Sequence, residues 1–219
     1  MTNINQPLVS IIVITYNSSE FLFETLESIK SQSYDNIELI ISDDCSSDST
    51  LTLSQKWITI NKDRFTNVKI ITSEKNKGTS KNINKGYRAA KGEWIKSIAG
   101  DDILLQNCIQ DNVIFVNKNK FVKVVQSKTY IIDSNSKIIG SALDMDSYFI
   151  LSKTPAEYQH RILLRKYTSN TTTIFINKDI IAEHGYYDES IILMEDYPIW
   201  LTLTKSGNKI YFLEKYTTK

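Results

Sequence analysis

Apolar runs alternate with helix-like segments along the first half of the chain. The run from Leu8 to Thr15 is rich in β-branched residues and almost entirely apolar, which predicts a strand covered on both faces. Three further runs are also predicted as strands: Ile37–Ser42, Asn67–Thr72 and Glu93–Ala99. A segment with apolar residues at helical spacing follows each run, as Leu22, Leu26 and Ile29 do after the first. The alternation predicts an α/β fold whose mostly parallel sheet has helices on both faces and right-handed crossovers.

Several helix boundaries carry their own signals. Asn17 followed by Glu20 predicts a capping pair at the start of the first helix, and the second helix is expected from about Asp48. Near the end of the chain, Pro198 suits the first turn of a helix and Gly207 suits its end. These signals predict a late helix that begins within the segment MEDYPIW.

After Lys120 the pattern becomes a mixture of strands and helices. The segments FVKVVQSKTYIID and KIIGSAL, joined by a DSNS turn, predict a hairpin of two longer strands. Residues 144–158 predict a loop that leads into a short helix, and Thr171–Ile176 predicts another strand. Because no linker-like or low-complexity segment interrupts the chain, the simplest interpretation is a single domain over residues 1–219.

The composition is that of an ordinary globular protein. The 219 residues are 41% hydrophobic and 23% charged, and the formal net charge is only +1. Residues 61–91 hold nine Lys or Arg against two acidic residues, a pattern that is most often a solvated helix face. Nothing in the overall charge points to nucleic acid, so we expect no nucleic-acid partner.

The cysteine count and the apolar runs indicate a cellular setting. Cys45 and Cys108 are the only cysteines and form no CxxC pair, which fits a reducing compartment. The apolar stretch from Leu8 to Ile14 falls far short of the roughly 20 residues of a spanning helix. No basic residue precedes it, so neither a signal peptide nor a transmembrane segment is predicted, and we expect a cytoplasmic protein.

Polar and acidic residues follow each of the four predicted parallel strands. Because the carboxyl ends of parallel strands meet at one edge, where helix N-termini point their amides inward, these side chains should converge. A single acid such as Asp48 commonly caps the next helix, but paired acids at two strand ends exceed what a cap requires. We therefore predict a binding site at this edge, formed by Tyr16 and Asn17, Asp43 and Asp44, residues 74–76, and Asp101 and Asp102.

Several kinds of site are excluded by the spacing of residues. The segment DDCSSDST lacks the glycine and glutamate of an EF-hand, and the GxGxxG, P-loop, HExxH and GxSxG motifs are absent. His160 and His184 are isolated and expected to be structural. What remains is an all-oxygen site that favours Mg²⁺ or Mn²⁺, completed by substrate phosphates. For a diphosphate, Lys81, Lys85 or Arg88 would add charge-assisted bonds.

Four sequence blocks resemble, in order and spacing, the inverting family 2 glycosyltransferases of GT-A fold. The blocks are VSIIVITYN, ELIISDDCSSDST, NKGTSKNINKGYRAAKGEWIKSIAGDDIL and MEDYPIWLTL. They extend from about Val9 to Leu203, and together they are specific to the family although not to a substrate. The resemblance implies a nucleotide-sugar transferase that uses a divalent cation, most often with UDP-sugars. It also implies a nucleotide-binding half over residues 1–102 and an acceptor-side half over residues 103–219.

The resemblance implies roles for the nucleotide-binding residues by matching position. Tyr16 would stack on the base, and Asp44 would accept a hydrogen bond from the uracil ring nitrogen with Asp43 supporting it. Asp101 would face the ribose. Lys81 stands where many members carry Arg and would contact the phosphates.

The resemblance also implies the catalytic groups. Asp102 would bind the metal on the diphosphate, and Asp196, with Glu195 second, would act as general base near the start of the late helix. A carboxylate of ordinary pKa, about 4, stays ionised at neutral pH and can receive the acceptor's proton. The metal would stabilise the departing diphosphate on the opposite face, so the anomeric centre inverts. The plainer alternative is that both acids only stabilise the helix N-terminus.

The sequence also departs from many members of this family. Ala99 stands where many carry a further Asp, and the chain ends at Lys219 where many continue, which predicts truncation at the C-terminus. The implied acceptor is a hydroxyl of a glycan or lipid-linked saccharide, and attachment to the inner face of a membrane is compatible with it. Two alternatives stay open: a non-catalytic nucleotide-sugar binding module, and a sugar nucleotidyltransferase. The second lacks support because no glycine-rich phosphate loop lies near the amino terminus.

Overall fold

The parallel half of the fold is built from the first four apolar runs. A computed structural model describes residues 5–141, 152–166, 171–191 and 194–219. Its first strands are β1 (Val9–Thr15), β2 (Ile37–Asp43), β3 (Asn67–Thr72) and β4 (Trp94–Ala99). They pair in parallel in the order β3-β2-β1-β4, with Val9 beside Ile37 on one side and Trp94 on the other. The predicted α/β arrangement is confirmed.

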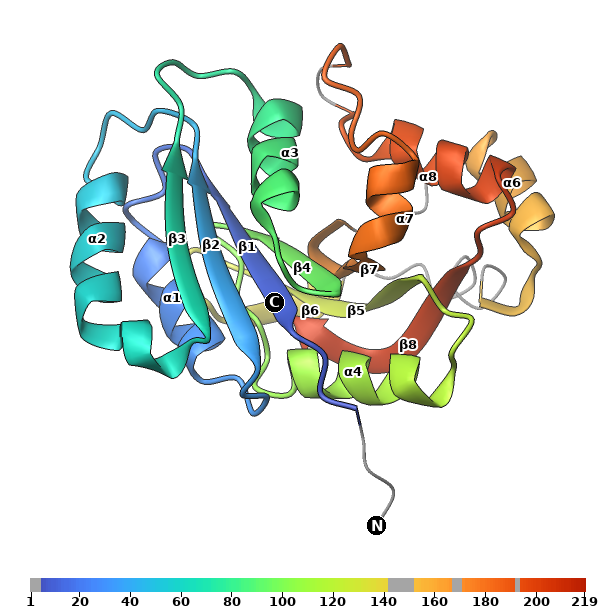
Figure 1. Cartoon of the computed structure of the whole chain (residues 1–219), viewed down its shortest axis with the longest axis horizontal. Coiled ribbons are helices and arrows are strands. Elements are labelled where there is room, and N and C mark those ends of the chain that lie inside the picture. Colours follow the sequence, from blue (N-terminus) through green and yellow to red (C-terminus); the bar gives the residue numbers. More distant parts are fainter. Residues whose placement is uncertain (1–4, 142–151, 167–170, 192–193) are drawn as a thin grey trace.

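Helices cover both faces of this sheet, as Figure 1 shows. One face carries α1 (Leu22–Lys30), α2 (Thr50–Asn61) and α4 (Cys108–Lys118), and the other carries α3 (Thr79–Ala89). Along β1, Val9, Ile11 and Val13 pack with the first group, whereas Ile12 packs with α3. Because side chains of a strand alternate between faces, a strand covered on both sides needs a continuous apolar sequence. This explains why the first apolar run becomes the central strand.

The second half adds strands of mixed direction to the same sheet. These strands are β5 (Val124–Ile132), β6 (Ile138–Ser141), β7 (Phe175–Asn177) and β8 (Ile210–Thr218). β7 lies antiparallel between β4 and β5, β6 pairs with β5 in a hairpin, and β8 runs parallel to β5. The expected mixed second half is therefore confirmed within the described residues.

Short helices lie in both halves of the fold. They are the 3-10 helices η1 (Lys62–Arg64) and η2 (Thr171–Thr173), and the α-helices α6 (Ala156–Leu163), α7 (Lys178–Glu183) and α8 (Tyr197–Lys205). As predicted, Pro198 lies in the first turn of α8, and Gly207 follows the helix with a φ of 85°. No helix within the described residues has both the length and the hydropathy that a bilayer span requires.

Two local predictions were wrong. The first helix begins at Leu22 with Phe21 as N-cap, because the Asn17 side chain accepts a hydrogen bond from Ser47 N (2.8 Å) in the neighbouring loop. The predicted strand at Thr171–Ile176 begins instead as the turn η2, and only residues 175–177 pair. Most of the predicted loop over residues 144–158 lies outside the described residues.

One glycine is required by a close approach of two backbone segments. The Gly92 N–H donates to Ser10 Oγ (2.9 Å) where the chain enters β4. A Cβ atom at this position would lie 2.6 Å from Ser10 N and 2.8 Å from Leu8 O. Backbone atoms of a central strand cannot move aside as a flexible side chain can.

Gly92→Ala is therefore expected to lower the free energy of unfolding by about 1 to 3 kcal/mol, the usual cost of overpacking. The matched control is Gly140→Ala on β6, where an added Cβ meets no atom of the described chain within 4 Å and should cost less than about 0.5 kcal/mol. Urea denaturation of both variants measures the difference. Equal effects at the two glycines would contradict the close approach.

Candidate active site

The carboxyl ends of β1, β2 and β4 form one edge of the molecule, beside the N-terminus of α3 (Figure 1). A cavity of about 260 Å³ at this edge is lined by Tyr16, Asp44 and Asp101. Residues from the first turn of α3, including Thr79 and Asn82, complete it. Three of the five predicted nucleotide-binding residues, which are distant in the sequence, therefore line one cavity.

Asp44 is the best-defined group of this cavity. Its Oδ2 atom accepts hydrogen bonds from Lys77 N (2.8 Å) and Gly78 N (2.7 Å), and the side chain is buried. Gly78 has a φ of 89°, in the left-handed region that glycine adopts without strain. The Oδ1 atom is buried and has no hydrogen-bond partner in the described part of the chain. A buried carboxylate oxygen without a partner lowers stability. A ligand that donates a hydrogen bond could remove this cost.

Asp43 has a different environment although it is the adjacent residue. Its buried carboxylate accepts hydrogen bonds from Thr15 Oγ1 (2.9 Å), Ser46 N (2.9 Å) and Ser46 Oγ (2.5 Å). These bonds attach the loop after β2 to the end of β1. Asp43 therefore supports the position of Asp44 and does not line the cavity of its neighbour.

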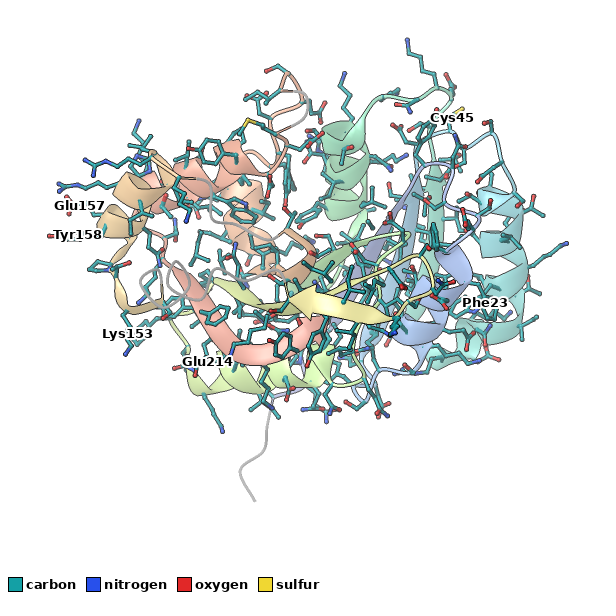
Figure 2. The ribbon with its side chains drawn as sticks, turned by 180° about the vertical axis from the view of Figure 1, so that it is seen from behind. Phe23, Cys45, Lys153, Glu157, Tyr158 and Glu214 are labelled. Carbon is teal, nitrogen blue, oxygen red and sulfur yellow. The ribbon has the colours of Figure 1, made fainter. Side chains whose placement is uncertain are left out.

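Tyr16 lines the cavity, whereas the adjacent Asn17 does not. Tyr16 is 51% exposed, so its ring is accessible for stacking. Asn17 has a φ of 51°, and its N–H donates to Ser46 Oγ (2.8 Å). Cys45 lies at the same edge with its thiol exposed, as Figure 2 shows. The loops after β1 and β2 are thus held together by their own polar side chains.

Asp101 and Asp102 connect this cavity to a second one. A cavity of about 410 Å³ is lined by both aspartates, by Glu24 of α1 and by Thr172 of η2. Asp101 lines both cavities, whereas Asp44 lines only the first and Asp102 only the second. The two cavities therefore adjoin at Asp101.

Burial raises the pKa of Asp102 to about 6, and the neighbouring charge of Asp101 adds to this effect. Lys96 opposes the shift through its positive charge. A bound cation would relieve the repulsion between the two carboxylates. Within the described ranges, no group of three or more His, Cys, Asp or Glu side chains is placed to hold a metal ion. The pair fits Mg²⁺ or Mn²⁺ when substrate oxygens complete the shell, the usual situation for such ions on phosphates.

The three cations predicted to contact the phosphates lie outside both cavities. Lys81, Lys85 and Arg88 line a third cavity of about 430 Å³, which shares no described lining residue with the Asp44 cavity. Lys85 Nζ donates to Asp43 O (2.9 Å), and Arg88 pairs with Glu189 (3.2 Å). Lys85, which is half-buried, and Arg88, which is exposed, therefore have protein partners, and Lys81 is also exposed.

The two candidate bases lie at the start of α8. Asp196 Oδ2 accepts hydrogen bonds from Thr171 Oγ1 and from Trp200 Nε1 (3.2 Å). Among the described residues, neither Glu195 nor Asp196 lines the cavity of about 260 Å³ at Asp44 or the cavity of about 410 Å³ at Asp102, called the Asp102 cavity below. The turn η2 connects Asp196 to the Asp102 cavity, because Thr171 contacts Asp196 and Thr172 lines that cavity.

Sequence reasoning missed the residues that hold the predicted ones in place. Asn82 of α3 is buried and donates to Thr15 O (3.2 Å) and Ser42 O (2.8 Å), which ties the helix to two strand ends. Lys96 is fully buried within β4 and donates to Thr172 O. The signal for Lys96 in the sequence was a lysine inside a mostly apolar strand.

A family model described as "Glycosyl transferase family 2" matches residues 10–185. Among relatives, EpsE of Bacillus subtilis is 35% identical over 214 residues, covering 95% of this chain and 71% of EpsE. The "UDP-Glc:alpha-D-GlcNAc-diphosphoundecaprenol beta-1,3-glucosyltransferase WfaP" of Escherichia coli is 28% identical over 202 residues, covering 92% and 72%. An uncharacterized glycosyltransferase of Haemophilus influenzae is 27% identical over 207 residues, covering 93% and 62%.

Solved structures share the fold. S. aureus TarS 1-349 in complex with UDP-GlcNAc matches with a TM-score of 0.76 and 22% identity, covering 96% of this chain and 57% of that one. The mannosyltransferase PcManGT from Pyrobaculum calidifontis, in complex with GDP-Man and Mn²⁺, matches with a TM-score of 0.69 and 18% identity, covering 96% and 56%. The expected GT-A fold is therefore confirmed. The chain spans less than two thirds of the Haemophilus relative and of both solved chains.

Asp102→Asn is expected to raise the free energy of unfolding of the ligand-free protein at pH 7, by on the order of 1 kcal/mol, because the variant buries no ionised carboxylate. The folded-state pKa of about 6 exceeds the ordinary value, so stability of the unmodified chain is recovered as the pH falls through 6. The gain should therefore shrink towards about pH 4.

Urea denaturation at neutral and acidic pH measures this dependence. Glu20→Gln is the control, because Glu20 is exposed and its substitution should change stability by less than about 0.5 kcal/mol at either pH. A gain from Asp102→Asn that is the same at both pH values would show that burial of the charge is not its cause.

Proposed function

Because the chain belongs to glycosyltransferase family 2, we propose that it transfers a sugar from a UDP-sugar to a hydroxyl group of a glycan or lipid-linked acceptor. The observation that carries the choice of donor is the buried Oδ1 atom of Asp44, which has no hydrogen-bond partner among the described residues. The uracil ring of a UDP-sugar offers an N–H donor of the kind that this atom lacks.

The neighbouring residues support a nucleotide in the same cavity. The half-exposed ring of Tyr16 is available to stack on the base, and Asp101 is available to the ribose hydroxyls at the junction with the second cavity. TarS, a structural match, has been solved with UDP-GlcNAc. Asp43 would act indirectly, by holding the loop that carries Asp44. We propose that Lys81 attracts the donor's phosphates electrostatically from the adjoining surface.

We further propose that Asp102, assisted by Asp101, would hold a Mn²⁺ or Mg²⁺ ion together with the donor's phosphate oxygens. Such an ion supplies Lewis-acid stabilisation of the charge on the departing diphosphate. PcManGT, which shares the fold, has been solved with GDP-Man and Mn²⁺. The raised pKa of Asp102 supports this assignment, because a site that repels its own negative charge favours a bound cation.

Asp196 is the proposed general base, with Glu195 as the second candidate. The acceptor hydroxyl loses its proton to the Asp196 carboxylate while its oxygen forms a bond to the anomeric carbon. The bond from that carbon to the diphosphate oxygen breaks on the other face, so the configuration inverts. Thr171 and Trp200 donate to Asp196 Oδ2 and thereby limit its movement.

The acceptor is proposed from the relatives. WfaP and WfgD of Escherichia coli are named for transfer from UDP-Glc to a diphosphoundecaprenol-linked GlcNAc. By analogy, the acceptor here would be a lipid-linked saccharide used in surface polysaccharide assembly. The protein would then work in the cytoplasm, at the inner face of the membrane.

Asp196→Asn tests the enzyme against the alternative of a non-catalytic binding module. The substitution is expected to lower turnover at least about 100-fold, because an amide cannot accept the proton. Binding of the UDP-sugar with Mn²⁺, measured as the rise in melting temperature, should be unchanged. Glu195→Gln is the matched control and should retain most of the activity. Full activity in Asp196→Asn would contradict the assignment, and donor binding without turnover in the unmodified chain would favour the binding module.

Asp44→Asn tests the nucleotide base. The amide can keep the acceptor contacts to Lys77 N and Gly78 N while it places N–H groups where Oδ1 was. A donor would then face the uracil N–H, so the Kd for UDP should rise about tenfold or more. The Kd for CDP should improve relative to UDP, because the cytosine ring nitrogen is an acceptor.

Calorimetric titration of both nucleotides measures this change in preference. Asp188→Asn, which alters an exposed carboxylate on another cavity, is the control and should leave both Kd values unchanged. Equal weakening of UDP and CDP by Asp44→Asn would mean that Asp44 does not read the base.

A further inference from the structure

Lys96 is a buried cation that the proposed reaction does not use. It lies within β4, on the central part of the sheet, and its side chain is completely buried. No carboxylate of the described chain lies within ion-pair distance of its ammonium group. Removing a lysine from water without an ion pair is unfavourable, so a sequence retains it only when its contacts serve a purpose.

The Lys96 ammonium group contacts the turn η2. Lys96 Nζ donates to the carbonyl oxygen of Thr172. The turn packs beside β4, β5 and β8, where the parallel half of the sheet meets the mixed half. The lysine therefore contacts the backbone of a short irregular segment at this junction.

The same turn contacts both parts of the proposed reaction centre. Thr171 Oγ1 donates to Asp196 Oδ2, and Thr172 lines the cavity that contains Asp101 and Asp102. Burial lowers the pKa of Lys96, and Cys108 and Asp102 oppose that shift. One buried ammonium group thus lies between the cation side of the site and the carboxylate proposed as base.

We propose that Lys96 is a positioning residue for sugar transfer: through Thr172 it holds η2 so that Thr171 keeps Asp196 in its reactive orientation. This inference rests on the proposed function, because it assigns Asp196 the role of base. It goes beyond that function by adding a residue that touches neither donor nor acceptor. A lysine with only a packing role would affect stability and not the reaction.

Lys96→Met removes the charge and retains most of the apolar stem. The expected result is a fall in kcat of at least about tenfold, because a misplaced base slows proton transfer. The KM for the UDP-sugar and the UDP-induced rise in melting temperature should change less than about twofold, since Lys96 does not line the Asp44 cavity. Lys69→Met, the same change at an exposed position of β3, is the matched control and should leave all three quantities unchanged.

Variants of Thr171 test the same chain of contacts without disturbing the sheet. Thr171→Val should lower kcat as Lys96→Met does. Thr171→Ser keeps the hydroxyl and should therefore have the kcat of the unmodified chain. The double variant of Lys96→Met and Thr171→Val should be little slower than the slower single variant, because both changes release one carboxylate. Multiplicative losses in the double variant would overturn the proposal.

Hydrogen exchange provides a readout that does not need turnover. In Lys96→Met, amides of η2 and of the first turn of α8 should exchange at least about tenfold faster, while those of α1 and Lys69→Met should not change. Unchanged protection there would overturn the proposal even if kcat fell. If the unmodified chain shows no transfer, the proposed function fails, and exchange still decides whether Lys96 controls this segment. If Lys96→Met does not fold, Thr171→Val and Thr171→Ser decide by the same kcat criterion.

Discussion

The hydrogen bonds from Lys77 N and Gly78 N to one oxygen of Asp44 determine the layout of the site. They join the end of β2 to the start of α3, and they leave the other oxygen of the same carboxylate buried and unsatisfied by the described protein atoms. The conformation needed for this contact is available because residue 78 is glycine. One oxygen of this carboxylate therefore stabilises the junction of β2 and α3, and the other is available to the proposed donor.

The pair at residues 101 and 102 shows the opposite use of charge. Backbone amides stabilise the Asp44 carboxylate, whereas burial and the adjacent carboxylate of Asp101 raise the pKa of Asp102. Such an arrangement is unfavourable in the empty chain and becomes favourable when a cation is present. The stability lost at this position is small beside that of the core formed on both faces of β1. Placing the repulsion at a loop beyond a buried strand confines the cost to the place where binding can recover it.

The sequence predicted the parallel half of the fold well because its inner strands β1, β2 and β4 are covered on both faces, which favours a continuous apolar run such as Leu8–Thr15. It predicted the convergence of Tyr16, Asp44 and Asp101 because that follows from strand direction alone. It failed at Asn17 and at Thr171–Ile176, where tertiary hydrogen bonds decide the local structure. The sequence around Asn17 is typical of a helix cap, but the oxygen of its side-chain amide accepts a hydrogen bond from Ser47 N in the loop after β2. No local pattern could report that partner.

The role of the second half follows from one reversal of direction. β7 enters antiparallel to β4, so the residues just before it are brought to the edge that carries Asp101 and Asp102. This is why η2, at the start of β7, can contact the cation side of the site through Thr172 and the start of α8 through Thr171. A parallel strand in this position would have delivered its carboxyl end to that edge and left its preceding segment at the far side of the sheet. Lys96 reaches η2 because β4 and the turn are neighbours only in this topology, so the antiparallel insertion brings the proposed base and the proposed cation site within one network of contacts.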